Sequence, residues 1–207
     1  MIFEFAGVSG VGKTTLITAL RNTDKDSVIV CKENSALYDT VWIMRNLSKV
    51  SSNLPYIIDH RRWFRCLLSV LQKYKLPMRD IAKLLWHAAT LNEALEECDK
   101  DRFIYIIDEG VTHFVWSVLM RIHSMDKELA FELLRLFQMP DLLVYVYADT
   151  ETIKKRLLQR RKRTRILETD DLETEIRRNE VQFRELIRLM IDNDAIEKEN
   201  VIYIDNN

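Results

Sequence analysis

The chain has 207 residues and a formal net charge of −1, with 47% hydrophobic and 30% charged residues. A chain of this length is expected to form one globular domain that buries roughly 70% of the surface of its unfolded state. The near-zero net charge gives no global attraction to nucleic acid or to an anionic membrane. Any basic function must therefore come from a local cluster of side chains.

Cysteine usage and apolar patterning predict a soluble protein of a reducing compartment. The three cysteines, Cys31, Cys66 and Cys98, are far apart and form no C-x-x-C pair, which argues against a disulfide framework or a zinc site. The first residues carry no basic region of the kind that opens a signal peptide. No apolar stretch reaches the ~20 residues that span a bilayer. We therefore expect a cytoplasmic protein without a membrane segment.

Short apolar runs alternate with helical patterns along the chain. Each run is rich in β-branched and aromatic residues and is nearly continuous, which is typical of parallel strands covered on both faces. The five runs are Ile2–Ala6, Val28–Cys31, Phe103–Ile107, Leu142–Ala148 and Val201–Ile204. This alternation predicts an α/β three-layer sandwich with a five-stranded parallel sheet, in one domain over residues 1–207.

Long helical patterns fill the segments between these strands, as expected for a chain with only four glycines and three prolines. Residues 54–100 contain no strand pattern and should form a helical insertion beside the sheet. Phe114–Phe137 reads as one further apolar helical stretch of the core. A last long helix is expected over Leu172–Ala195.

A phosphate loop opens the chain. Gly7-Val8-Ser9-Gly10-Val11-Gly12-Lys13-Thr14 matches the Walker A pattern G-x-x-x-x-G-K-[ST] in full and lies between a predicted strand and a predicted helix. Its backbone N–H groups, through Thr15, would cradle the phosphates of a nucleoside triphosphate. Lys13 would reach the β- and γ-phosphates, and the Thr14 hydroxyl would bind Mg²⁺.

Acidic residues follow two of the predicted strands. Asp108 comes directly after Phe103–Ile107 and is expected to hold Mg²⁺, directly or through water. Glu109 would activate water in an ATPase or contact the acceptor in a kinase. Glu33 follows Val28–Cys31 near the same sheet edge and could be the general base for an acceptor hydroxyl or bind the acceptor otherwise. A solvated turn and an exposed loop acid are the plain alternatives for Asp108 and Glu33.

A basic stretch lies at about residues 154–170. Its basic residues are Lys154, Lys155, Arg156, Arg160, Arg161, Lys162, Arg163 and Arg165. Arg156 and Arg160 share one helix face, and we favour a lid in which they close over the transferring phosphoryl group. The alternatives are a solvated helix and a nucleic-acid patch. Nucleic acid is disfavoured because no aromatic residue is interleaved to stack on bases.

Together these segments resemble the thymidylate kinase-like group of P-loop kinases, which includes the nucleoside and nucleotide kinases. The resemblance lies in the phosphate loop, in Pro140-Asp141-Leu142-Leu143-Val144-Tyr145, in the spacing of Glu151, Arg156 and Arg160, and in the closing strand Val201–Asp205. It implies the nucleotide-kinase order of strands, ATP as the donor, and a loop after the closing strand that cradles adenine.

The acceptor side departs from the family pattern. Asp108-Glu109-Gly110 stands where thymidylate kinases have an Asp-Arg-Tyr-like triplet and deoxynucleoside kinases a Glu-Arg-Ser-like one. The stretch Leu84–Leu91 lacks the arginine of the family's central helix. The resemblance therefore implies a kinase, and these departures argue against thymidylate as its acceptor.

The helical insertion offers basic and aromatic candidates for the acceptor side. They are Arg45, His60, Arg61, Arg62, Arg65 and Arg79, with Trp63 and Trp86. The cluster from His60 to Arg65 could grip an anionic acceptor, and its alternative is a set of plain surface residues.

The sequence thus predicts ATP- and Mg²⁺-dependent phosphoryl transfer to a small-molecule acceptor, which is a nucleoside, a nucleotide or a sugar. A P-loop ATPase that uses Asp108 and Glu109 for hydrolysis, and a nucleotide-dependent switch without turnover, are the alternatives. The acceptor's identity and the oligomeric state, a homodimer included, stay open.

Overall fold

A parallel sheet forms the centre of the computed structural model, which describes residues 1–23, 28–31, 55–98, 103–159 and 171–207. Its five strands run in the order β2-β3-β1-β4-β5. They are β1 (Ile2–Ala6), β2 (Val28–Cys31), β3 (Ile104–Asp108), β4 (Leu142–Tyr147) and β5 (Val201–Asp205). The α/β class and the parallel sheet agree with the prediction from the sequence, and the strand bounds differ from the predicted ones by at most one residue.

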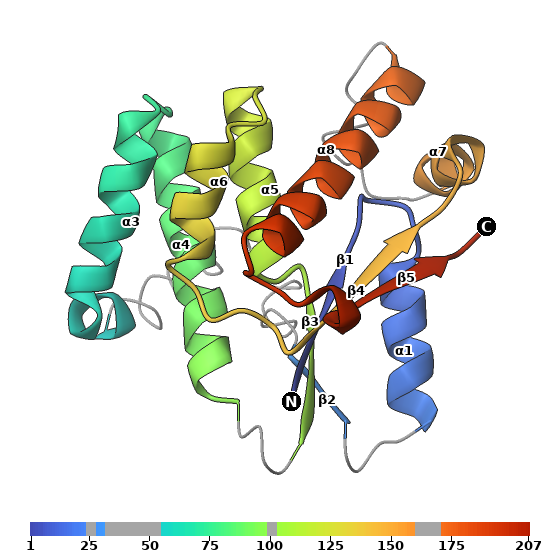
Figure 1. Cartoon of the computed structure of the whole chain (residues 1–207), viewed down its shortest axis with the longest axis horizontal. Coiled ribbons are helices and arrows are strands. Elements are labelled where there is room, and N and C mark those ends of the chain that lie inside the picture. Colours follow the sequence, from blue (N-terminus) through green and yellow to red (C-terminus); the bar gives the residue numbers. More distant parts are fainter. Residues whose placement is uncertain (24–27, 32–54, 99–102, 160–170) are drawn as a thin grey trace.

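Helices lie on both sides of this sheet (Figure 1). They are α1 (Lys13–Thr23), α3 (Arg61–Lys73), α4 (Met78–Glu96), α5 (Val111–Ile122), α6 (Lys127–Leu134), α7 (Thr150–Gln159) and α8 (Leu172–Asp192), and a short 3-10 helix, η3 (Lys198–Asn200), precedes β5. On one side α1 packs against β1, β2 and β3. On the other side α5 packs against β1 and is flanked by α4 and α8, with α3 and α6 further out.

The register of the central strand determines which residues meet at the carboxyl edge of the sheet. Phe5 of β1 lies opposite Asp108 of β3, and Ala6 lies opposite Tyr145 of β4. The loop that follows β1 and the turn that follows β3 therefore emerge side by side. The phosphate loop and the turn that holds Asp108 and Glu109 therefore lie at this one edge.

The apolar stretch 114–137 is helical, as the sequence predicts, and is divided between α5 and α6. The chain leaves α5 through His123, which has a left-handed φ of +53°. It enters α6 at Asp126, whose carboxylate accepts a hydrogen bond from Leu129 N at 2.9 Å. An Asp N-cap of this kind satisfies one of the free N–H groups of a new helix. The continuous apolar pattern concealed this start signal.

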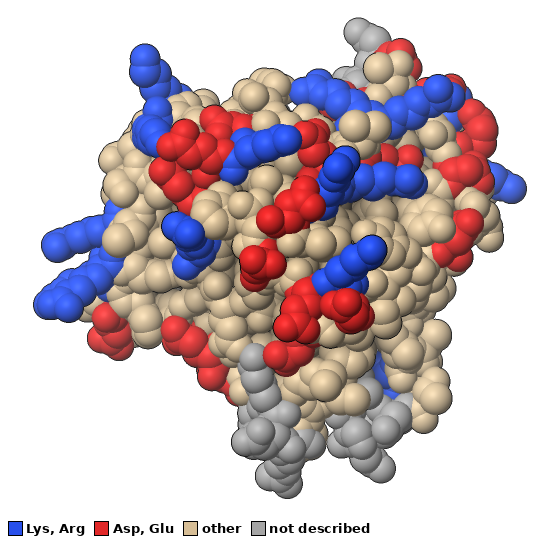
Figure 2. Space-filling model, in the orientation of Figure 1, with Lys and Arg blue, Asp and Glu red and all other residues tan. Residues whose placement is uncertain are grey.

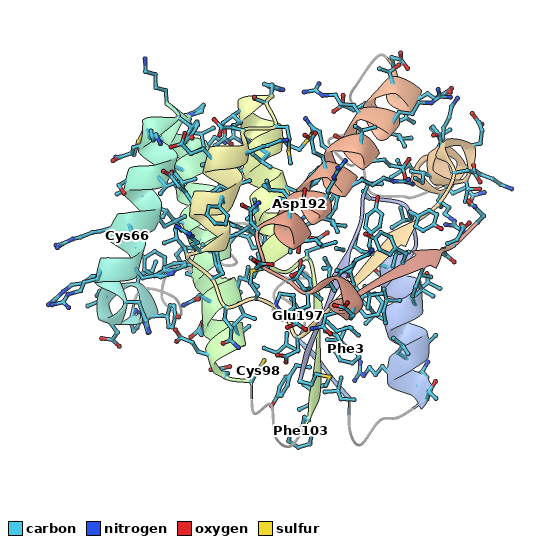
Figure 3. The ribbon with its side chains drawn as sticks, viewed as in Figure 1. Phe3, Cys66, Cys98, Phe103, Asp192 and Glu197 are labelled. Carbon is cyan, nitrogen blue, oxygen red and sulfur yellow. The ribbon has the colours of Figure 1, made fainter. Side chains whose placement is uncertain are left out.

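The described side chains include those of two cysteines and of most of the charged residues. Cys66 on α3 and Cys98 after α4 lie well apart (Figure 3), and Cys98 Sγ lies 3.1 Å from Ala94 O. Basic and acidic side chains are interspersed over the face drawn in Figure 2. None of the described helices is both long enough and apolar enough to span a bilayer.

A buried carboxyl group joins the central strand to α5. Glu4 of β1 is only 1% exposed, and its Oε1 accepts hydrogen bonds from the backbone N–H of Thr112 (2.8 Å) and of His113 (3.4 Å). These donors belong to the first turn of α5, where N–H groups have no partner within the helix. A Cβ on Gly110 would lie 2.7 Å from the Glu4 carboxyl carbon, so any other residue here would displace the carboxyl group.

Burial raises the pKa of Glu4 from 4.5 to about 7, against the opposing effect of the hydrogen bonds from Thr112 and His113. In the unfolded chain this carboxyl group ionises near its ordinary pKa. Between these two pKa values the unfolded state releases a proton that the folded state retains. The contribution of Glu4 to stability is therefore fully present below pH 4.5 and is lost as the pH rises through about 7.

Replacing Glu4 by glutamine should make the protein's stability less dependent on pH, because the amide keeps an acceptor oxygen and cannot ionise. As the pH rises from 5 to 8, the free energy of unfolding of Glu4→Gln should increase by about 2 kcal/mol relative to that of the original chain. Urea unfolding at both pH values measures this difference. Glu199→Gln, at an exposed position of η3, serves as the control and should show no such gain. An equal pH dependence of Glu4→Gln and the original chain would contradict the account.

Candidate functional site

The phosphate loop connects β1 to α1 and is built around glycines in left-handed conformations. Gly7, Gly10 and Gly12 have φ values of +139°, +99° and +97°. Two conditions exclude a side chain at Gly7. Its positive φ is rarely adopted by other residues, and a Cβ would collide with the carbonyl oxygen of Val146 in β4. At Gly10 a Cβ would lie 3.1 Å from the side chains of Ile153 and Leu157 in α7, so this glycine makes room for a different element.

Lys13 is the first residue of α1 and folds back over the loop. Its side chain is 7% exposed, and its Nζ donates a hydrogen bond to Gly7 O at 2.7 Å and a longer one to Val8 O at 3.5 Å. The helix start beneath it presents free N–H groups and the positive end of the helix dipole, which together favour a bound phosphate. The ammonium group is thus held at the mouth of an anion-binding loop.

The Thr14 hydroxyl and the Asp108 carboxylate meet across the sheet edge. Thr14 Oγ1 donates to Asp108 Oδ2 at 3.3 Å, which joins the start of α1 to the end of β3. Hydroxyl and carboxylate oxygens are ligands that Mg²⁺ prefers, and Mg²⁺ commonly completes its shell with water and substrate phosphates. Among the described residues no group of three or more His, Cys, Asp or Glu side chains could form a metal site alone. The donor set present fits a magnesium ion shared with a nucleotide.

Glu109 follows directly in a strained turn. Its φ is +67°, which is uncommon for a residue with a side chain, and the side chain is 48% exposed. Its Oε1 lies 3.9 Å from Nε2 of His113, one turn along α5. The pKa of His113 lies well below its ordinary value, chiefly because the ring is buried and also because Lys13, His87 and Arg121 disfavour a further positive charge. The imidazole is therefore uncharged at neutral pH.

Two donors from distant parts of the chain converge on the carbonyl of Val11 at the crest of the loop. Arg156 Nη1 of α7 lies 3.2 Å from this oxygen, and Asn206 Nδ2 lies 2.6 Å from it. Asn206 is positioned by its backbone N–H, which bonds to Tyr147 O at 2.9 Å. Its amide nitrogen lies so close to Gly12 that a Cβ on Gly12 would collide with it. The segment after β5 thus runs against the phosphate loop.

The structure brings together most of the site residues that the sequence predicts. Around the loop lie Lys13, Thr14, Asp108, Glu109 and Arg156. Glu33 and Arg160 lie outside the described residues, as do Arg45 and the basic residues 161–165.

The basic cluster of the helical insertion lies elsewhere. Arg61, Arg62 and Arg65 are exposed on α3, which packs against α4 and α6 and lies across the molecule from α1 (Figure 1). His60 Nε2 lies 3.3 Å from Glu96 Oε2, within the insertion itself. The three arginines are therefore surface residues, and His60 contacts a residue of the insertion itself.

Sequence reasoning missed three residues of the site region: Glu4, His113 and Asn206. Glu4 bonds to the start of α5, His113 approaches Glu109, and Asn206 bonds to Val11. A charged residue inside a predicted buried strand was an available signal for Glu4, because carboxylates are rarely buried without partners. His113 and Asn206 carry no comparable pattern.

Comparison with known proteins finds likeness in structure alone. No protein-family model matches the chain, and no curated protein matches it in sequence. It is similar to a thymidylate kinase from Candida albicans at 15% identity and a TM-score of 0.51, over 99% of this chain and 82% of that one. It is also similar to deoxyadenosine kinase from M. mycoides at 15% identity and a TM-score of 0.57, over 100% of this chain and 91% of that one.

A second structure of the M. mycoides enzyme, with bound dATP, matches at 13% identity and a TM-score of 0.53, again over 100% and 91% of the two chains. At such low identity the likeness establishes the fold and no more. The chain has the fold of the thymidylate kinase-like group of P-loop kinases.

Proposed function

We propose that this protein transfers the γ-phosphoryl group of ATP to a small-molecule acceptor in a Mg²⁺-dependent reaction. The strongest support is the hydrogen bond between Thr14 and Asp108, which joins a complete phosphate loop to a carboxylate at the end of the neighbouring strand. The fold adds support, since a structure of the same fold binds dATP. The proposed kinase domain covers residues 1–207, with the acceptor-side insertion at about 54–100 and the lid at about 154–170.

The nucleotide side is assigned to the loop and the start of α1. Backbone N–H groups from Gly7 to Thr15 would bind the phosphates, and Lys13 would exchange its contact with Gly7 O for the β- and γ-phosphates. Thr14 and Asp108 would hold Mg²⁺, which when bound offsets negative charge on the phosphates. Asp108 already faces Thr14, so this assignment requires little rearrangement of either side chain.

Arg156 is assigned to the transferring phosphoryl group, together with Arg160 of the proposed lid. The guanidinium of Arg156 already lies against the loop, at Val11 O. A guanidinium close to the γ-phosphate stabilises the charge that develops in transfer. On the acceptor side Glu109 and Glu33 remain the two candidates for orienting the acceptor hydroxyl, and Glu109 lies beside Asp108 in the same turn.

The first test is transfer of label from γ-labelled ATP with Mg²⁺ to pooled nucleosides, nucleoside monophosphates and sugars. Lys13→Ala should lower the transfer rate by at least about 100-fold, as removal of a group that stabilises transition-state charge does. Lys13→Met, which keeps most of the aliphatic stem, should lose activity equally while unfolding at the temperature of the original chain. Lys198→Ala, at an exposed position of η3, is the control. A folded Lys13→Met protein with full activity would refute the assigned role.

An ATPase is the second candidate, because Asp108 and Glu109 stand in succession where hydrolytic P-loop enzymes place a water-activating carboxylate. The kinase proposal expects free phosphate to stay near background in a reaction without acceptor, in the original chain and in Glu109→Gln alike. Rapid acceptor-free release of phosphate that Glu109→Gln abolishes would establish the ATPase instead. ATP binding without turnover in any lane would favour a nucleotide-dependent switch.

A further inference from the structure

The turn between β3 and α5 places two carboxylates in succession beside the phosphate loop. The Asp108 carboxylate accepts the hydrogen bond from Thr14 and so faces the nucleotide side of the site. Glu109 has a left-handed φ of +67°, and its side chain stays about half exposed, at 48%. A molecule in solution can therefore reach the Glu109 carboxylate.

His113 approaches Glu109 without supplying a positive charge. Its Nε2 lies 3.9 Å from Glu109 Oε1, and its ring packs near those of Trp116 and Phe183, at centroid distances of 5.2 and 6.3 Å. This burial, with Lys13, His87 and Arg121 nearby, lowers the pKa of His113 well below its ordinary value. An uncharged imidazole can orient a carboxylate by hydrogen bonding, but it does not offset its charge.

Lys13 and Arg156 lie on the donor side of the described site, whereas Arg121, which is near enough to lower the pKa of His113, lies 3.8 Å from the carboxylate of Asp80. Lys13 bonds to the carbonyl oxygens of Gly7 and Val8, and Arg156 bonds to that of Val11. These groups face the nucleotide phosphates of the proposed reaction. The opposite side, at the β3–α5 turn, presents the Glu109 carboxylate beside Asp108.

We infer that the acceptor is an uncharged hydroxyl compound, such as a nucleoside or a free sugar, and that Glu109 excludes acceptors that carry a phosphate group. The inference rests on the proposed kinase activity and names the class of its second substrate. A phosphate monoester has a charge near −2 at neutral pH, and the negative charge of the Glu109 carboxylate repels it. A hydroxyl group instead donates a charge-assisted hydrogen bond to a carboxylate.

The transfer step balances with such an acceptor. The acceptor hydroxyl oxygen forms a bond to the γ-phosphorus of ATP, and the bond from that phosphorus to the β–γ bridging oxygen breaks. ADP leaves with the electron pair of the broken bond, and the hydroxyl proton ends in the solvent. The products are a phosphate monoester and ADP, and no further reactant is required.

Matched pairs of acceptors test the inference on the full chain with ATP and Mg²⁺. The pairs are thymidine and thymidine 5′-monophosphate, deoxyadenosine and its 5′-monophosphate, and glucose and glucose 6-phosphate. Label should enter the uncharged member of a pair. The ratio of kcat/KM for the phosphorylated member to that for the uncharged member should rise at least about tenfold in Glu109→Gln and further in Glu109→Arg. Glu199→Gln should leave this ratio unchanged.

Each outcome separates the inference from the activity on which it rests. Transfer to the phosphorylated members alone would overturn the acceptor class and leave the kinase proposal standing. An unchanged ratio in both Glu109 variants would overturn the role of Glu109. Absence of label in every pair, although ATP binds, would overturn the kinase proposal and this inference with it.

A binding measurement covers the case in which the Glu109 variants lose activity. Inorganic phosphate is titrated into each protein after saturation with a non-hydrolysable ATP analogue and Mg²⁺, so that the phosphate loop is already filled. Phosphate should bind more tightly to Glu109→Gln than to the original chain, and most tightly to Glu109→Arg. Equal behaviour of all three proteins would contradict exclusion of anions by Glu109.

Discussion

The position of β1 between β3 and β4 determines where every group of the candidate site lies. Because β1 pairs with both neighbours in parallel, its carboxyl end opens onto the same edge as theirs. The register that sets Phe5 opposite Asp108 also brings the loop after β1 within hydrogen-bond reach of that carboxylate through Thr14. A slip of one residue would turn every side chain of the strand to the other face and separate these two groups.

The loop glycines do more than turn backbone N–H groups inward, because each one also makes room for a different neighbour. Gly7 lies against the β4 backbone at Val146, Gly10 against Ile153 and Leu157 of α7, and Gly12 against Asn206 after β5. Arg156 and Asn206 add hydrogen bonds to Val11 between these contacts. The loop is therefore shaped from three sides before any nucleotide arrives, which lowers the entropy lost when a ligand binds.

Whether a structural feature could be predicted from the sequence depends on how far apart in the chain its residues lie. The strands, the phosphate loop and Asp108 were predictable because their signals are local: buried runs of few residues, a fixed motif, and an acid at a strand end. The bond from Asn206 to Val11 spans 195 positions, and the bond from Glu4 to Thr112 spans 108. No local pattern specifies such pairs. The break at His123 was missed for the opposite reason, since apolar residues continue on both sides of a short left-handed turn.

The buried carboxyl group of Glu4 also affects the unfolding enthalpy that a calorimeter measures for this protein. At pH values between 4.5 and about 7 the folded chain holds a proton there that the unfolded chain has released. Folding in this range takes up that proton from the buffer, and unfolding returns it. The apparent enthalpy in a calorimeter then contains the ionisation enthalpy of the buffer. Scans of one sample in phosphate and in a buffer with a large ionisation enthalpy will differ, although the protein itself is unchanged.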